Sequence, residues 1–169
     1  MQETEHLILD KARQEDWEDM YRGVWSRPEC NRYMFWNLTT DEEAARDRMA
    51  RTVRWQAAHD AWTVREKESG RAIGFTGVSP DDADTAEEQG ICLAPEYWRR
   101  GFGTEILRAL TDYAKTVLGA KRFVCRARTD NIASRSLIEK EGFRFIGEEE
   151  VEDHRDGTPR TLAVYEKEL

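Results

Sequence analysis

The stretch PEYWRRGFGTEILRALTDYAKTVLG, residues 95–119, decides how the fold is interpreted. Arginines at positions 99 and 100 and glycines at 101 and 103 stand directly before a helical pattern that begins near Thr104. The first N–H groups of a helix have no partners within the helix and carry the positive end of its dipole, so they attract anions. Glycine lets the backbone approach an anion closely, and arginine adds positive charge. The turn is therefore predicted to bind a phosphate group.

Two better-known phosphate-binding loops do not match this turn. A nucleoside-triphosphate loop needs the spacing GxxxxGK[ST], which supplies a lysine and a magnesium-binding hydroxyl, and a dinucleotide fold needs GxGxxG. Neither spacing occurs in the chain. Glycine turns before helices are common, so a tight connection between a strand and a helix is the alternative at this point.

Downstream of the turn, helices alternate with strands. An apolar stripe follows the helix, with Gly119 where the helix should end. The stripe consists of Ile106, Leu107, Leu110, Tyr113, Ala114 and Val117. A short strand is predicted at RFVCRA (122–127) and a short helix from Asn131 to Gly142. Two closing strands, FRFIGEEEVED (143–153) and TLAVYEKEL (161–169), are predicted to flank a turn at Asp156-Gly157.

Upstream of the turn, the pattern begins with a strand and two helices. HLILDKA (6–12) is predicted as a strand, and a helix is predicted from Gln14 to Trp25 because apolar residues recur there at three- and four-residue spacing. That stripe consists of Trp17, Met20, Tyr21, Val24 and Trp25. A second helix is predicted over 40–59, with Thr40 as N-cap and Glu43 completing a capping box. Its expected apolar contacts are Met49, Val53 and Trp55.

A hairpin and a further strand lead into the glycine turn. Residues 61–80 alternate in polarity around Ser69-Gly70, which predicts two strands joined by a turn. The acidic segment DDADTAEE (81–88) is predicted as a loop, and EQGICLAP (88–95) as a strand that Pro95 ends. No repeat, low-complexity segment or domain linker is apparent, so the 169 residues are expected to form one domain;.

Composition limits the classes of function. A net charge of -8 argues against nucleic acid or an anionic membrane as partner and weakly suits a cationic one;. No apolar run approaches the roughly 20 residues of a membrane span, and the opening residues lack a secretion signal, so a cytoplasmic location is predicted. The three cysteines, Cys30, Cys92 and Cys125, include no CxxC pair and are predicted to be buried thiols rather than disulfide or metal ligands;.

The chain resembles the GNAT N-acetyltransferases over nearly its whole length, in particular the branch similar to the RimJ and RimL acetyltransferases of ribosomal-protein N-termini. The family's pyrophosphate loop, Gln/Arg-x-x-Gly-x-Gly/Ala, is matched by residues 98–103, with Trp98 departing at the first position. Residues 131–134, Asn-Ile-Ala-Ser, and 139–143, Glu-Lys-Glu-Gly-Phe, resemble the family's Asn-x-x-Ser and Glu-Lys-x-Gly-Phe segments.

This resemblance implies an α/β fold: a single domain over residues 1–169 with a twisted, mixed, mainly antiparallel sheet flanked by helices. The strand ending at Pro95 and the strand RFVCRA would splay apart into a V-shaped slot for acetyl-CoA, the co-substrate, and no metal is implied. Backbone groups of Ile91, Cys92 and Leu93 would pair with the pantetheine arm. The pyrophosphate would be held by Arg99, Arg100, Gly101, Phe102, Gly103 and Thr104.

Two further residues are expected at CoA, each with an alternative. Asn131 would bond the pantetheine arm, or it would cap the helix that follows it. Lys140 would reach a CoA phosphate, or only solvent.

The catalytic assignments also carry alternatives. Glu88 is predicted as the base that deprotonates the amine, because it begins the strand that lines CoA; a solvated carboxylate is the alternative. The rival bases are Glu152, Asp153 and His154. Many family members have a tyrosine that protonates the CoA thiolate where this chain has Ile138. Ser134 is the nearest substitute, unless its hydroxyl only bonds the helix start, and Tyr165 is expected in the core.

The predicted reaction is direct attack of a primary amine on acetyl-CoA in a ternary complex, without a covalent enzyme intermediate. A protein N-terminus, a polyamine-like or antibiotic amine and an amino-acid derivative remain open as acceptors, with the net charge tilting toward cations. Either a substrate wall or the core would contain Trp25, Tyr33, Phe35 and Trp36. The alternative function is a non-catalytic CoA-binding sensor or interaction module. A homodimer is compatible with the sequence.

Overall fold

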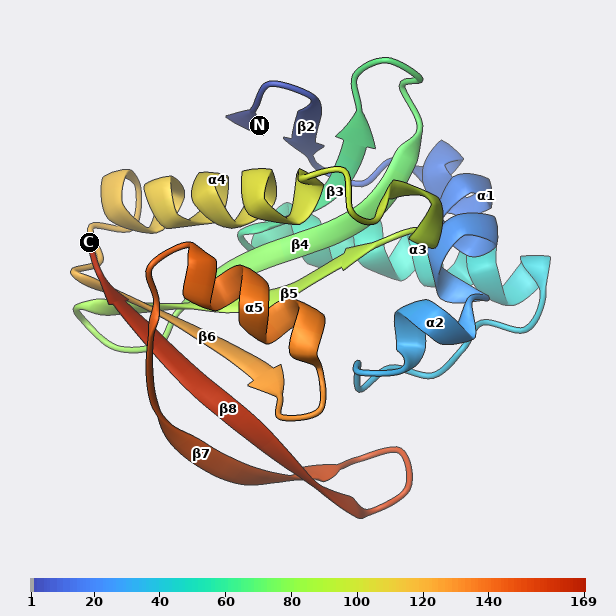
Figure 1. Cartoon of the computed structure of the whole chain (residues 1–169). Helices are drawn as coiled ribbons and strands as arrows, with labels where there is room; N and C mark the ends of the chain where they lie inside the picture. The colour runs from blue at the N-terminus through green and yellow to red at the C-terminus, as the bar shows by residue number, and fades with distance from the viewer. Residues whose placement is uncertain (1) are drawn as a thin grey trace. The chain divides into compact units, whose positions relative to one another are not determined.

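The computed structural model describes residues 2–169, which form two compact units. The first unit contains the chain up to Gly77 together with Gln89–Ile106. The second contains Val78–Glu88 and Leu107–Leu169. Strands β4 (Ala72–Pro80) and β5 (Thr85–Leu93) and helix α4 (Phe102–Thr116) each contribute residues to both units (Figure 1).

The first unit is built on antiparallel strands. Its pairing order is β1 (Gln2–Glu3), β2 (Leu7–Asp10), β3 (Ala61–Glu66) and β4, with β3 and β4 forming the predicted hairpin. Between β2 and β3 the chain forms five helical segments: η1 (Gln14–Asp16), α1 (Trp17–Met20), η2 (Tyr21–Trp25), α2 (Pro28–Asn31) and α3 (Glu42–Ala58). A short turn η3 (Pro95–Tyr97) precedes α4.

The second unit contains a parallel strand pairing. Strand β5 runs parallel to β6 (Arg122–Arg128), which pairs antiparallel with β8 (Thr158–Glu168). Strand β8 pairs antiparallel with β7 (Arg144–Asp153), and α5 (Ile132–Lys140) connects β6 to β7. The predicted fold class, a mixed and mainly antiparallel sheet with flanking helices, is confirmed.

Apolar periodicity predicted part of the core of the first unit. Met20, Val24 and Trp25 are buried together with Met49 of α3 in one cluster. Trp55 departs from its predicted role because 49% of its surface is exposed. Its position on α3 turns it away from the cluster, where it instead stacks on His59 at 4.5 Å between ring centroids.

The core of the second unit is formed by α4 and the strands. Leu107, Leu110 and Ala114 are fully buried, and so is Tyr165 of β8, as predicted. Val117 was expected in the same stripe, yet it is 61% exposed. It follows the last residue of α4, Thr116, so the helical spacing no longer directs it toward the core.

Several predicted boundaries are wrong in detail. Asp41, not Thr40, is the N-cap of α3, because its carboxylate accepts a hydrogen bond from the N–H of Ala44. The segment 81–88 was predicted as a loop, but β5 begins at Thr85 and pairs with β6 from that residue onward. The acidic composition of this segment does not reveal that part of it pairs with a strand far along the chain.

Helix α4 begins at Phe102, two residues before the predicted start. All three cysteines are buried and free, which confirms their prediction as packing thiols. Within residues 2–169 the structure contains no helix that is both long and apolar enough to cross a membrane.

Candidate active site

The turn before α4 has the backbone conformation that the sequence suggested. Gly101 has a φ of +85°, a left-handed conformation that side chains disfavour, and a Cβ placed on it would meet no atom within 4 Å;. Arg99 also has a positive φ, +60°. Because α4 starts at Phe102, the N–H groups of its first turn have no intrahelical partners and lie beside this open space;.

Arg100 stabilises the turn from within the first unit. Its Nη2 lies 2.9 Å from Oε1 of Glu66, whose side chain is only 8% exposed. The guanidinium also lies over the rings of Tyr97 and Phe102, at 5.3 and 4.7 Å from their centroids. Both arginines of the turn are exposed, but Arg100 is held by these contacts with the protein.

Glu105 fixes the first turn of α4 to the β1–β2 connection. Its Oε1 accepts hydrogen bonds from the N–H of His6, at 2.8 Å, and from the hydroxyl of Thr4. Burial alone would raise the pKa of Glu105, but these hydrogen bonds hold it below its usual value;. The helix N-terminus is thus positioned by side chains remote in sequence.

The end of β5 contains the three residues predicted to pair with the pantetheine arm. Ile91 is half-buried, whereas Cys92 and Leu93 are buried. The carbonyl of Leu93 accepts a hydrogen bond from Nε1 of Trp98 at 2.7 Å, and Sγ of Cys30 lies 3.5 Å from it. Of the three predicted pantetheine-pairing residues, Leu93 therefore already has its carbonyl bonded within the protein.

The thiol of Cys92 is buried against Cys30. Its contact with Cys30, followed by burial, raises the pKa of Cys92 well above the usual value;. The structure thus supports a packing role for this residue.

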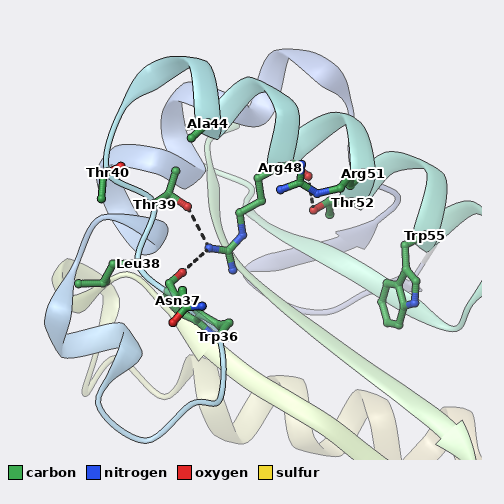
Figure 2. Close-up of a pocket in the computed structure, with 10 residues that line it drawn as sticks. All are labelled: Trp36, Asn37, Leu38, Thr39, Thr40, Ala44, Arg48, Arg51, Thr52 and Trp55. Atoms are coloured by element: carbon green, nitrogen blue, oxygen red, sulfur yellow. Dashed lines mark hydrogen bonds between the residues drawn. The ribbon is translucent and has the colours of Figure 1, made fainter. Parts of the chain in front are cut away.

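A pocket of about 580 Å³ lies between α3 and the segment that precedes it (Figure 2). Trp36 to Thr40 form one side, and side chains of α3, including Arg48, Arg51 and Trp55, form the other. A second cavity of about 200 Å³ shares Trp36, Arg48, Thr52 and Trp55 with the first. It extends to Phe75 of β4 and Gln89 of β5, so the two cavities reach the strand residue that directly follows Glu88 in the chain.

Arg48 is the central cation of this pocket. Its Nη1 donates hydrogen bonds to the carbonyl of Asn37, at 3.2 Å, and to Oγ1 of Thr39, at 3.0 Å. The guanidinium lies 4.7 Å from the ring centroid of Trp25 and 4.6 Å from that of Trp36. Burial lowers the pKa of Arg48 to about 10, which still leaves it protonated at neutral pH.

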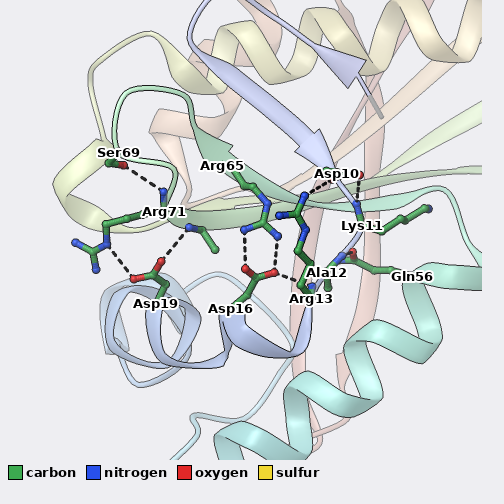
Figure 3. Close-up of polar contacts among 11 residues, drawn as sticks. Asp10, Lys11, Ala12, Arg13, Asp16, Asp19, Gln56, Arg65, Ser69 and Arg71 are labelled. Carbon is green, nitrogen blue, oxygen red and sulfur yellow. Dashed lines mark hydrogen bonds and ion pairs between the residues drawn. The ribbon is translucent and has the colours of Figure 1, made fainter.

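Arg65, in the same unit, has a different environment (Figure 3). Its two terminal nitrogens donate to the two carboxylate oxygens of Asp16, both at 2.6 Å, and both side chains are at least nine-tenths buried. The hydrogen bonds from Arg65 to Asp16 raise the pKa of Arg65. Figure 3 also shows Asp19 bonded to Arg71 at 2.9 Å, so this side of the unit is held by paired charges.

The remaining predicted site residues belong to the second unit. The parallel register of β5 and β6 joins three residue pairs and ends at Glu87 and Val124, although both strands continue. Glu88 is half-buried, and its negative charge, added to burial, raises the pKa of Cys125 on β6. Glu87 forms an ion pair with Arg126 at 2.5 Å.

Helix α5 carries the other three candidates. Oδ1 of Asn131 accepts a hydrogen bond from the N–H of Ser134 at 3.2 Å, so Asn131 caps the helix as its alternative role required. Ser134 is half-buried and Lys140 is exposed in the last turn. Tyr165 has its hydroxyl 2.9 Å from both Glu139 and Arg135, which fits a core residue with a bonded polar tip;.

The rival base Asp153 is engaged in the turn between β7 and β8. Its carboxylate lies 2.6 Å from Arg155 and 3.4 Å from Arg160, and its side chain is fully buried. The hydrogen bond from Arg155 holds the pKa of Asp153 well below its usual value. A carboxylate held in its charged form by two arginines is a poor proton acceptor at neutral pH.

Sequence reasoning missed the pocket arginines. Arg48, Arg51, Thr52 and Trp55 recur at intervals of three, four and seven residues from Arg48, so they share one face of α3;. That polar and aromatic face was visible in the sequence, but the opposite wall, which begins at Trp36, has no regular pattern. Among residues 2–169, no cluster of three or more His, Cys, Asp or Glu side chains is arranged to hold a metal.

Several known proteins are similar to this chain over nearly its whole length. The uncharacterized N-acetyltransferase p20 of Bacillus licheniformis is 29% identical over 96% of this chain and 91% of its own length. A GNAT acetyltransferase structure from Bacillus anthracis has a TM-score of 0.83 at 20% identity, covering 98% of this chain and 96% of that one. The microcin C7 self-immunity acetyltransferase MccE, solved with acetyl-CoA and AMP, has a TM-score of 0.78 at 19% identity over 98% and 93% of the two chains.

The fold agrees with these solved structures, and a sequence model of the family adds the assignment. The model of the acetyltransferase (GNAT) domain matches residues 6–144, which include the glycine turn and the predicted Asn131 segment. The chain therefore belongs to the GNAT acetyltransferase family.

Proposed function

We propose that this enzyme transfers the acetyl group of acetyl-CoA to a primary amine. The observation that carries the proposal is the turn before α4, where a left-handed Gly101 and the N–H groups of a helix start border open space. Such a turn suits a pyrophosphate, because backbone donors and the helix dipole both favour a negative charge. Membership of the GNAT family supports acetyl-CoA as the molecule that brings it.

Within this proposal, the residues of the turn divide their roles. The N–H groups of Phe102, Gly103 and Thr104 bind the pyrophosphate, and exposed Arg99 adds charge. Arg100 supports the turn through Glu66. Backbone groups of Ile91 and Cys92 pair with the pantetheine arm, while Leu93 contributes less because its carbonyl is bonded by Trp98.

The chemical step needs the amine in its neutral form. An α-amino group has a pKa of about 7.7 to 8.0 and a lysine amine about 10.4, so a base is required more for the second. Glu88 is the proposed base, acting directly or through water, and Ser134 the proposed donor to the CoA thiolate. The amine attacks the thioester directly in a ternary complex, with the proximity of the two substrates supplying much of the rate.

The acceptor is either a small amine or a protein N-terminus. The segments at residues 131–134 and 139–143 support the branch similar to RimJ and RimL, whose members act on ribosomal-protein N-termini. Asn131 and Lys140 are the proposed CoA contacts of this segment, with Asn131 also capping α5.

Thermal unfolding with acetyl-CoA tests the proposed cradle. A ligand at about 100 times its dissociation constant stabilises the folded state by about 2.7 kcal/mol, which raises Tm by several degrees at about 2 to 4 °C per kcal/mol. Gly101→Val should remove this rise, because a β-branched side chain cannot easily adopt a φ of +85° and would occupy the open space;.

Gly119→Val is the matched control. Gly119 also has a positive φ, +67°, and a Cβ placed on it would likewise meet no atom within 4 Å, but it follows the other end of α4. This variant should be destabilised similarly and still respond to acetyl-CoA. If Gly101→Val responds as fully as the wild type, the turn does not bind CoA.

Glu88→Gln separates an enzyme from a CoA-binding module. The enzyme should lose at least about tenfold in turnover, since general base catalysis contributes about 10²- to 10⁴-fold, with acetyl-CoA binding nearly unchanged. Binding of acetyl-CoA without transfer to any amine would instead indicate a sensor or interaction module.

A further inference from the structure

The pocket along α3 has a charge opposite to that of the whole chain. The chain carries a net charge of -8, yet the residues that line the 580 Å³ pocket include Arg48 and Arg51 and, within the described part of the chain, neither Asp nor Glu. We propose that this pocket binds an anionic oxyacid group, a carboxylate or a phosphate, on the amine acceptor, with Arg48 as its main partner. This inference rests on the proposed function and names its substrate class.

The geometry of Arg48 leaves one edge of its guanidinium for a ligand. Both of its hydrogen bonds to the protein come from Nη1, to the carbonyl of Asn37 and the hydroxyl of Thr39. Nε and Nη2 form the fork that binds a carboxylate or phosphate through two parallel hydrogen bonds. Trp25 and Trp36 hold the plane of the guanidinium in place, so the fork is already oriented.

The charge of Arg48 lacks an acidic partner among residues 2–169. The influences on its pKa are burial, the thiol of Cys92 and the charge of Arg51, and no carboxylate of these residues is among them. Arg65 shows the contrasting solution, since its Nη1 and Nη2 each donate to a carboxylate oxygen of Asp16 at 2.6 Å. A half-buried cation next to a second cation attracts an anion strongly, because there is little water to screen it.

The shape of the cavities orients the acceptor. Arg48 borders both cavities, whereas Arg51 borders the outer one and Gln89 of β5 the inner one. An acceptor bound by its anion at Arg48 can therefore direct its amine along the inner cavity toward Gln89 of β5. The exposed ring of Trp55 and the indole of Trp36 provide apolar surface between these ends.

These features favour an amino acid, or a small amine that carries a phosphate, over a polyamine. A polyamine would place positive charge beside Arg48 and Arg51 and would be repelled. The acidic net charge of the chain favoured cationic acceptors in the sequence analysis. The lining of this pocket is basic instead, so that expectation does not apply to it.

Calorimetric titration tests the anion site without requiring turnover. The ligands are N-acetylleucine and N-acetylphenylalanine, each paired with its neutral carboxamide, and N-acetylated phosphoethanolamine as the phosphate. We expect at least one anion to bind about tenfold or more tightly than its neutral counterpart, as charge-assisted hydrogen bonds imply. Tighter binding of the phosphate would assign the anion as a phosphate. Equal binding of acids and amides, or no binding of any ligand, would overturn the proposal.

Variants assign the effect to Arg48. Arg48→Lys keeps the charge but loses the fork, and Arg48→Met loses both, so anion affinity should fall about tenfold or more in the first and further in the second. Arg51→Gln covers the case in which Arg48 variants do not fold, and it should weaken anion binding about two- to tenfold. Arg54→Gln is the matched control, because Arg54 is exposed on α3 and does not line the pocket. If Arg51→Gln and any folded Arg48 variant bind the anion like Arg54→Gln, the assignment is wrong.

Turnover separates this inference from the proposed function. If the enzyme acetylates neutral or cationic amines as well as amino acids, the acetyltransferase function stands and the anion site does not. If carboxylates bind at Arg48 but no amine is acetylated, the anion site stands and the proposed reaction fails.

Discussion

The regions around Arg65 and Arg48 show two ways in which one protein accommodates an arginine below its surface. Arg65 is paired through both terminal nitrogens with Asp16, and both side chains are buried. Arg48 is packed between two indole rings and bonds only neutral acceptors. The first arrangement satisfies the charge within the fold, whereas the second leaves capacity for a ligand.

The difference follows from the cost of taking a charge out of water. A buried cation requires a compensating charge or hydrogen bonds, and a carboxylate in bidentate contact supplies both. Aromatic faces and neutral oxygens compensate less, so the site retains an attraction for anions. A buried cation that is paired with a carboxylate therefore indicates a structural role, and one that bonds only neutral groups indicates a candidate binding site.

The largest expected effect comes from breaking the Arg65 pair. Asp16→Asn leaves a buried guanidinium without its charge partner, and removing one member of a buried pair costs about 3 to 5 kcal/mol. Urea unfolding should show a loss of this size. Arg13→Gln serves as control, since its ion pair with Asp10 is on the surface and contributes about 0 to 1 kcal/mol;. Equal losses in the two variants would mean that burial of the pair does not matter.

The same substitution at the two arginines is expected to give one loss of similar size, at Arg65, and one smaller loss, at Arg48. Arg65→Met isolates the buried carboxylate of Asp16 and should cost about 3 to 5 kcal/mol. Arg48→Met removes two hydrogen bonds and the cation–π contacts but isolates no charge, so about 1 to 2 kcal/mol is expected. Urea unfolding of the two variants in the absence of ligands measures both losses in the free energy of unfolding. A loss at Arg48 as large as that at Arg65 would make Arg48 a structural residue.

The smallest effect concerns pH and extends the comparison to a buried carboxylate. The arginines at 155 and 160 lower the pKa of Asp153, so the folded state binds its proton less readily than the unfolded state. The stabilisation from this pairing is complete above the unfolded pKa of about 3.9 and is lost as pH falls toward the lower folded pKa.

Asp153→Asn isolates this contribution from that of other carboxylates. The difference in Tm between wild type and variant should be constant from neutral pH to about pH 5 and then shrink by a few degrees as the pH falls toward about 2. A difference that persists unchanged at low pH would show that the charge of Asp153 is not what stabilises the turn.

The sequence predicted the elements that depend on local patterns. The strands at β2, β3 and β4, the stripe of α4 and the glycine turn all follow from spacing within a few residues. The N-cap of α3 was misplaced by one residue because Thr40 and Asp41 are both good caps, and the choice depends on which oxygen reaches the N–H of Ala44;. The start of β5 was missed because it depends on pairing with β6, which lies far along the chain.

The candidate site also combines features that local sequence predicts with features that depend on tertiary contacts. The turn at residues 98–104 was found from the sequence, since a helix start preceded by glycine and arginine carries its binding chemistry in consecutive residues;. Tertiary structure added contacts that the sequence did not predict at two members of the expected site, because Arg100 pairs with Glu66 and the Leu93 carbonyl accepts a hydrogen bond from Trp98. Neither partner is adjacent in sequence.

By itself, the sequence determined that a glycine turn precedes helix α4, because backbone conformation and helix position are local properties. Only the tertiary structure decided which charges are paired within the protein. Arg48 and Arg65 are the same residue type, and each has an acidic neighbour in the sequence. Their environments differ because Asp16 pairs with Arg65 and not with Arg48. Ion pairing depends on distance in space, so composition and spacing do not reveal which arginine is left for a substrate.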